Sequence, residues 1–179
     1  MNLGVYNKEG VKSLVMFNMD ETPIYFDMQR NATYHWRGDR SVSVVRTNGF
    51  KKRVTVCLAI SSDGRKLPPM IIFKRKNPPT NPLSKHVVVE AQTNAWITEG
   101  LMKTWIGKIW KKIDLPPNIV KLLLLDHCSA HLKDSVAKAV KENGHIDFIP
   151  PGTTSLLQPL DLMINKPFKE NLKDYMQSG

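Results

Sequence analysis

The run K-L-L-L-L-D at residues 121–126 constrains the fold of this chain more than any other stretch of its sequence. Its four leucines leave no polar alternation before the acid that ends it. A strand with one face in water alternates apolar and polar residues, whereas a continuous apolar run is typical of a strand buried on both faces. Helices cover both sides of sheets that contain such strands. The run therefore predicts a central strand of an α/β sheet.

The remaining patterns supply the other layers of such a fold. Residues 13–20 (S-L-V-M-F-N-M-D) form another apolar run that ends in an acid, and we predict that they form the first strand. Residues 53–60 and 67–73 predict a β-hairpin around a turn that contains Asp63 and Gly64. Residues 98–113 predict an amphipathic helix with Thr98 as its N-cap. Further predictions are a loop at 77–85, a helix at 132–142, a strand at 146–149 and a partly helical end at 161–176, where Pro167 starts or kinks the helix. Residues 21–50 show no sustained period and receive no assignment.

The charge balance favours an anionic partner. The 179 residues include 26 Lys and Arg against 16 Asp and Glu, a formal net charge of +10. Clustered cations gain free energy by releasing counterions from a phosphate backbone, which suits nucleic acid. No apolar run approaches the roughly 18 residues that span a bilayer, and residues 1–10 contain no signal-peptide core. We therefore expect an intracellular protein that does not act at a membrane. Two cysteines, Cys57 and Cys128, are too few for a disulfide framework, and we expect both to be inert.

Three acids occupy comparable places along the predicted fold. Asp20 closes the first predicted strand, Asp126 closes the leucine strand, and Asp161 follows the last strand in Q-P-L-D. Ligands of open α/β sheets gather outside the carboxyl ends of the strands, so these acids can meet at one edge. Converged carboxylates repel one another unless a cation joins them, and Mg²⁺ or Mn²⁺ is the hard cation that prefers such oxygens. The alternative is that each aspartate only caps a turn or a helix. Four other acids could replace one member of the set: Glu21, Asp27, Asp147 and Glu170.

Two basic triplets flank the predicted hairpin at its far ends. They are Lys51, Lys52 and Arg53 before the first arm, and Lys74, Arg75 and Lys76 after the second. Antiparallel arms would bring all six cations to one end of the hairpin. That end is either a DNA-backbone contact or simply a solvated edge of the sheet.

Other side chains suggest chemistry more weakly. His127, Cys128 and His131 have ligand types that zinc accepts, but no fourth ligand is evident. Ser129, His131 and Asp134 lie too close in sequence for the geometry of a hydrolase triad. We expect the four tryptophans to pack in the core or between helices rather than to stack on bases. They are Trp36, Trp96, Trp105 and Trp110. The turn at residues 150–155 (P-P-G-T-T-S) is interpreted as a rigid arm that positions Asp161.

Several blocks resemble a known family. F-N-M-D-E-T at 17–22, L-L-L-L-D-H-C-S-A-H at 122–131 and P-P-G-T-T-S-L-L-Q-P-L-D at 150–161 are similar to signature blocks of the pogo, Tigger and Jerky transposases. This group is a branch of the Tc1/mariner superfamily and includes the centromere protein B lineage. N-A-W-I-T-E-G-L-M-K-T-W at 94–105 and N-K-P-F-K at 165–169 also look familial. The resemblance runs from about residue 13 to 175, and its blocks occur in the family order.

The resemblance implies a ribonuclease-H-like fold at residues 13–176, after an N-terminal extension at 1–12. It also implies an Asp-Asp-Asp set that binds two Mg²⁺ or Mn²⁺ ions, with Asp20 touching both and Asp126 and Asp161 each holding mainly one. Such enzymes act on DNA: they hydrolyse a phosphodiester and then use the freed 3′-hydroxyl to attack a target. Residues 1–12 cannot hold the helix-turn-helix modules of family members, and His127 replaces the Asn that many relatives have after the second acid.

We therefore expect a DNA endonuclease and strand-transfer core that works in the nucleus. The rival interpretations are a domesticated DNA-binding or chromatin protein without activity, and a functionless remnant. The sequence leaves open whether the chain forms a homo-oligomer.

Overall fold

The computed structural model describes residues 13–26, 52–80 and 84–178. The elements are β1 (Ser13–Tyr25), β2 (Arg53–Ser61), β3 (Met70–Lys74), β4 (Val88–Gln92), α1 (Glu99–Lys108), η2 (Trp110–Lys112), β5 (Ile119–Leu125), α2 (Asp134–Lys141), β6 (His145–Phe148), α3 (Thr154–Leu157), η3 (Leu160–Ile164) and α4 (Asn165–Ser178). Within this part of the chain the strands form one mixed sheet in the order β4-β3-β2-β1-β5-β6. The predicted mixed α/β sheet is confirmed.

β1 is a central strand of the sheet, between β2 and β5, and is longer than predicted. On one side its residues 13–18 pair in parallel with β5, and on the other its residues 17–25 pair antiparallel with β2. The prediction that Asp20 closes the first strand is therefore wrong, because β2 continues to pair with β1 for five residues beyond it. Asp20 instead lies two residues past the point where the pairing with β5 ends. One edge of β1 is thus free of β5 where this acid stands.

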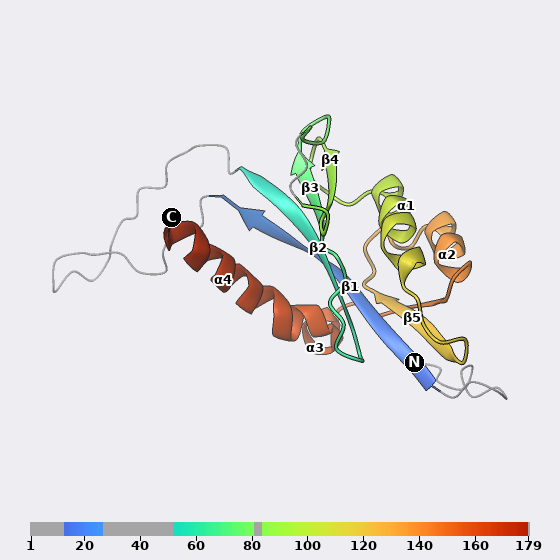
Figure 1. Ribbon diagram of the computed structural model, residues 1–179. Coiled ribbons are helices and arrows are strands. Elements are labelled where there is room, and N and C mark those ends of the chain that lie inside the picture. Colours follow the sequence, from blue (N-terminus) through green and yellow to red (C-terminus); the bar gives the residue numbers. More distant parts are fainter. Residues whose placement is uncertain (1–12, 27–51, 81–83, 179) are drawn as a thin grey trace, which may run out of the picture.

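Alternate residues of β1 serve two different layers. Val15, Phe17 and Met19 pack into the main core with α1, η2 and α2. On the other face Ile24 packs with Phe168 and neighbouring residues of α4. In Figure 1 α1 and α2 cover one side of the sheet, and α4 runs along the other. Asn18 and Asp20 belong to the α4 face, where they contact Leu160 and Asn165.

The other elements follow the sequence patterns closely. β2 and β3 form the predicted antiparallel hairpin, and its turn contains Gly64 at a φ of +86°, a conformation that favours glycine. Thr98 caps α1 by accepting a hydrogen bond from the Leu101 amide. The helix ends at Lys108 rather than near Ile113. The apolar stripe that suggested a longer helix continues into the 3₁₀ turn η2. β4 and the short helix α3 were not predicted.

A buried lysine fixes the start of β5 against the layer above it. Lys121 is 8% exposed, and its ammonium donates to the carbonyls of Trp110 and Ile113 and to Asn143. It also lies 4.7 Å from the centre of the Trp110 ring, and burial lowers its pKa. A Cβ on Gly144 would stand 2.7 Å from Trp110 and 2.9 Å from the Lys121 backbone, so only glycine fits there without a shift.

No helix in the described ranges is both long enough and apolar enough to cross a membrane.

Candidate active site

Two of the three predicted acids meet through one amide. The Asn165 Nδ2 donates to Asp20 Oδ2 at 2.6 Å and to Asp161 Oδ1 at 3.0 Å. Asp20 is buried at 7% exposure, and Asp161 lies at the exposed edge of the π-helical turn η3. The structure thus joins an acid in the sheet to an acid in the C-terminal layer. Asn165, which joins them, lies 145 residues after Asp20 in the chain.

Asp126 stands at the end of β5, beside the strand that carries Asp20. β1 and β5 are parallel, and their last pair is Asn18 with Leu124, so Asp20 and Asp126 each follow that pair by two residues at the same end of the sheet. Asn18 supports this corner from its other side: its Nδ2 donates to the Leu124 carbonyl, and its Oδ1 accepts from the Leu160 amide. The corner therefore ties β1, β5 and η3 together at the same end of the sheet.

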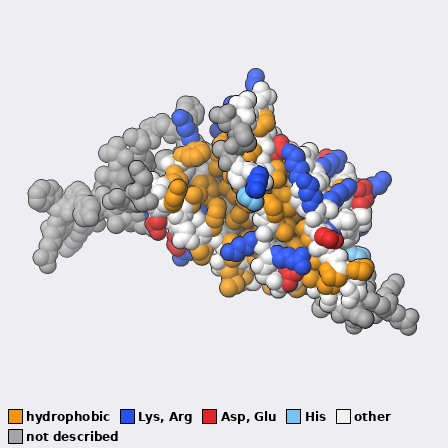
Figure 2. Space-filling view, in the orientation of Figure 1, with side chains coloured by type: hydrophobic (Ala, Val, Ile, Leu, Met, Phe, Trp, Pro, Cys, Tyr) orange, Lys and Arg blue, Asp and Glu red, His pale blue; other side chains and the backbone are white. Residues whose placement is uncertain are grey.

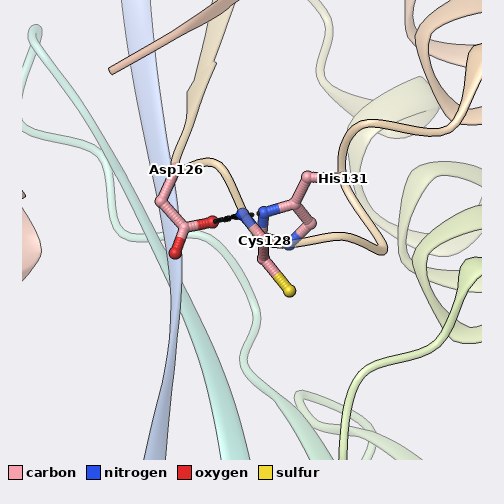
Figure 3. Close-up of side chains that lie close together, drawn as sticks. All are labelled: Asp126, Cys128 and His131. Carbon is pink, nitrogen blue, oxygen red and sulfur yellow. Dashed lines mark hydrogen bonds and ion pairs between the residues drawn. The ribbon is translucent and has the colours of Figure 1, made fainter. Parts of the chain in front are cut away.

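A buried histidine holds Asp126 in place. His131 is 0% exposed, with Nδ1 at 2.6 Å from Asp126 Oδ1 and Nε2 at 3.0 Å from Glu21 Oε1. The Cys128 amide donates to the same Asp126 oxygen at 3.0 Å. Figure 3 shows the carboxylate turned toward these two groups of the loop that follows β5. Because ionised carboxylates only accept, both ring nitrogens of His131 donate.

Asp20 and Asp126 lie in opposite electrostatic environments. Burial raises the pKa of Asp20 to about 7, against the lowering effect of the Asn165 hydrogen bond, and the charges of Asp161 and Glu21 raise it further. Burial alone would lower the pKa of His131, but its hydrogen bonds to Asp126 and Glu21 outweigh this effect and raise it to about 10. The His131 hydrogen bond holds the pKa of Asp126 below its usual value. The imidazolium therefore keeps Asp126 charged, while no cation among the described residues does the same for Asp20.

The structure supports neither the zinc site nor the hydrolase triad. One ligand atom each from Asp126, Cys128 and His131 lies within 4.8 Å of the others, but both His131 nitrogens already donate to carboxylates, which leaves no lone pair for zinc. His127, which the zinc alternative also needs, is exposed and packs edge-on against Phe148. A hydrolase triad would need one ring nitrogen of His131 to contact Ser129. Both nitrogens instead contact carboxylates, so the triad is excluded.

The basic hairpin end forms, as far as the structure describes it. Val54 pairs with Phe73, so Arg53 and Lys74 follow at neighbouring places on the two arms. A pocket of about 450 Å³ is lined there by Lys52, Arg53, Lys74 and Arg75 together with Phe26, Val54, Phe73 and Thr93. Lys76 is exposed just beyond, and Lys51 lies outside the described residues. Figure 2 shows Lys and Arg side chains at the tip beyond β3 and β4 and also over the α1 and α2 side.

One tryptophan departs from its predicted role. Trp105 and Trp110 are buried, as predicted, and Trp36 lies outside the described residues. Trp96 is 64% exposed, so the prediction that it packs in the core is wrong. The Arg53 guanidinium lies 5.2 Å from the centre of its ring and also donates to the Asn94 carbonyl, which fixes both side chains at the basic hairpin end. An exposed aromatic ring beside a cation is a usable contact for a nucleotide.

Sequence reasoning did not identify Asn165 or the role of His131. Asn165 belongs to the N-K-P-F-K block, but nothing in the pattern shows its partner across the molecule. The sequence pattern presents His131 as a zinc ligand or triad base and Glu21 as a substitute acid. The sequence shows only that Glu21 follows Asp20 directly and that His131 follows Asp126 by five residues; the burial of His131 between the two acids is visible only in the structure.

Comparisons with known proteins identify the family and the fold of this chain. Residues 51–178 match the family described as DDE superfamily endonuclease. A mouse (Mus musculus) protein named pogo transposable element with KRAB domain is 33% identical over 161 residues, which is 88% of this chain and 26% of the relative. The chain thus spans about a quarter of that relative's length.

Solved structures of the Mos1 transposase share the fold. The paired-end complex with the left transposon end has a TM-score of 0.60 at 14% identity, over 91% of this chain and 46% of the other. The mariner Mos1 paired-end complex with Mg has a TM-score of 0.57 at 14% identity, over 92% and 48%. The fold is therefore that of the ribonuclease-H-like catalytic domain of a transposase, and the chain belongs to the DDE superfamily endonucleases as a pogo-like transposase domain.

Proposed function

We propose that this chain is the metal-dependent catalytic core of a pogo-like transposase, or of a protein derived from one, and that it cuts and joins DNA in the nucleus. The observation that carries the proposal is the Asn165 bridge between Asp20 and Asp161, formed where β5 delivers Asp126 to the same end of the sheet. A fold with only a structural use for these acids would gain nothing from bringing a buried carboxylate against a second one.

The donor set suits hard divalent cations. Asp20, Asp126 and Asp161 offer carboxylate oxygens, and the charge of Asp161 disfavours ionisation of the buried Asp20. Two Mg²⁺ or Mn²⁺ ions would remove that conflict, and we propose that Asp20 contacts both while Asp126 and Asp161 each hold mainly one. When bound, such ions activate a water or a 3′-hydroxyl and stabilise the leaving oxygen of a phosphodiester. A Mos1 complex solved with Mg is a precedent for the fold.

The protein's own residues have separate tasks in this scheme. His131 keeps the Asp126 carboxylate ionised and fixed in direction through its 2.6 Å contact. It cannot serve as the general base, because both of its nitrogens already donate to carboxylates. The basic hairpin end, where the Arg53 guanidinium lies over the Trp96 ring, would bind the DNA backbone away from the acids.

A second candidate is a DNA-binding or chromatin protein without catalysis. It is favoured by the basic hairpin end, which needs none of the acids to contact DNA. The two candidates differ in their dependence on metal, since phosphate contacts by Lys and Arg respond to salt and not to Mg²⁺ occupancy of the acid site.

The test is a nicking assay of the protein fused to a competent DNA-binding module, on labelled duplex DNA with Mg²⁺ or Mn²⁺. We expect metal-dependent nicking that Asp126→Asn abolishes and that Asp134→Asn, a surface change on α2, leaves intact. Salt-sensitive binding without any nicking, unchanged by metal and by Asp126→Asn, would favour the second candidate instead.

A further inference from the structure

Asn165 is the junction between the π turn and the last helix. Its backbone N–H donates to the Leu160 carbonyl, five residues back, which makes η3 a π-helical turn. Such turns are rare and occur frequently at functional sites. Its side chain is nearly enclosed, at 6% exposure, and stands between the two carboxylates.

Only one end of the Asn165 amide is used. Nδ2 makes both hydrogen bonds to the acids, whereas Oδ1 is buried and has no hydrogen-bond partner among the described residues. A buried carbonyl oxygen without a partner costs about 1–3 kcal/mol, so its retention here asks for an explanation.

We propose that Asn165 is a further oxygen donor of the acid site, which turns its amide so that Oδ1 replaces Nδ2 between Asp20 and Asp161 when a divalent cation binds. This inference rests on the proposed function, because it requires the acids to bind a metal. The three aspartates then hold the ions together with one neutral oxygen from the same π turn that carries Asp161.

Rotation of the Asn165 amide group requires little change in packing. The amide nitrogen and oxygen differ little in size, so a half-turn of the amide group exchanges them without displacing a neighbour. In either orientation one end of the amide faces the acids and the other is left in the buried pocket. The charge between the carboxylates therefore decides the orientation: two anions alone attract the N–H groups, and a cation attracts the carbonyl oxygen.

The competing explanation is that Asn165 only positions Asp20 and Asp161 through its donated hydrogen bonds. Asn165→Leu separates the two ideas, because leucine neither donates a hydrogen bond nor offers an oxygen. If Asn165 only donates, its hydrogen bonds stabilise the metal-free acids, and their loss leaves Mn²⁺ binding as tight as in wild type or tighter. If Asn165 supplies an oxygen, Asn165→Leu binds Mn²⁺ more weakly, whereas Asn165→Asp keeps an oxygen and adds a charge that attracts the cation.

The experiment measures Mn²⁺ affinity by the loss of the free-ion electron paramagnetic resonance signal, on the full chain with Asn165→Asp and Asn165→Leu. Asn171→Asp and Asn171→Leu are matched controls, because Asn171 is an exposed asparagine on the same helix. We expect Asn165→Asp to bind Mn²⁺ more tightly than wild type and Asn165→Leu to bind it about tenfold more weakly. Both Asn171 variants should match wild type.

Thermal unfolding gives a second readout that needs no catalysis. In EDTA the Asn165→Asp protein should melt below wild type, and saturating Mn²⁺ should raise its melting temperature by more than it raises that of wild type. Mn²⁺ binding by Asn165→Leu that matches or exceeds that of wild type, or weaker binding by Asn165→Asp, would overturn the inference alone. No Mn²⁺ binding by wild type would overturn the proposed function and this inference with it. If Asn165→Leu does not fold, Asn165→Ala takes its place.

Discussion

Replacing Asp20 with asparagine should stabilise the metal-free protein at neutral and higher pH. Asp20 is buried beside Asp161 and Glu21, and its pKa is raised from 3.8 to about 7. Asparagine has nearly the same shape, carries no charge, and can still accept the Asn165 hydrogen bond through its own carbonyl oxygen. The change therefore removes a buried charge and keeps the contact.

The sign and size follow from linkage. Between about pH 4 and pH 7 the folded state binds the Asp20 proton and the unfolded state does not, so wild-type stability falls as the pH rises through this window. At 1.36 kcal/mol per pKa unit, the wild type should lose roughly 2.5 kcal/mol relative to Asp20→Asn between about pH 5 and pH 8. The full effect of the shift, about 4 kcal/mol, is an upper bound.

The assay is urea unfolding in EDTA at a series of pH values, with the free energy of unfolding compared between wild type and variant. Taking the difference removes the contributions of other groups, among them His131, whose raised pKa of about 10 also makes stability fall above about pH 6.5. Asp174→Asn, the same change at an exposed site of α4, is the control and should show a constant difference. A difference between wild type and Asp20→Asn that does not vary with pH would refute the reasoning.

Three further outcomes are expected. His131→Leu should lower the free energy of unfolding in EDTA by about 2 kcal/mol or more, because two carboxylates lose a charged donor, and equilibrium denaturation measures this directly. Gly144→Ala should cost about 1–3 kcal/mol in the same assay, since the added Cβ meets the Trp110 ring at 2.7 Å; unchanged stability would show that the ring can move aside. Arg53→Gln should weaken DNA binding and reduce the slope of log affinity against log salt by about 1, whereas Trp96→Ala should weaken binding without changing that slope.

Most of the sheet could be predicted, because the sequence patterns of its strands are local. Four leucines before Asp126 specify a strand buried on both faces, and the Asp63-Gly64 turn specifies the hairpin. The end of β1 was not predictable in the same way. Its last residues are held by pairing with β2, so the polar segment around Asp20 remains a strand although its own composition gives no sign of it.

The candidate site divides along the same line. That the acids would stand near one end of the sheet could be inferred, because chain order and the edge of an α/β sheet restrict where they lie; the structure joins Asp20 and Asp161 through Asn165. The groups that hold them could not, because Asn165 lies 145 residues from Asp20 and His131 lies 110 residues from Glu21. Local patterns carry no information on contacts of that range. The exposure of Trp96 was missed for a related reason, since its partner Arg53 comes from a distant strand.

The acids are shared between two separable pieces of the molecule. Asp20 and Asp126 are built into the sheet, and Asp161 comes with the outer layer that α4 lays across it (Figure 1). Even a small displacement of that layer would break the hydrogen bond from Asn165 to Asp20 and move Asp161 away from the sheet acids. A version of the chain cut after β6 would accordingly carry Asp20 on one piece and its Asn165 partner on the other, and only reassembly would restore their contact.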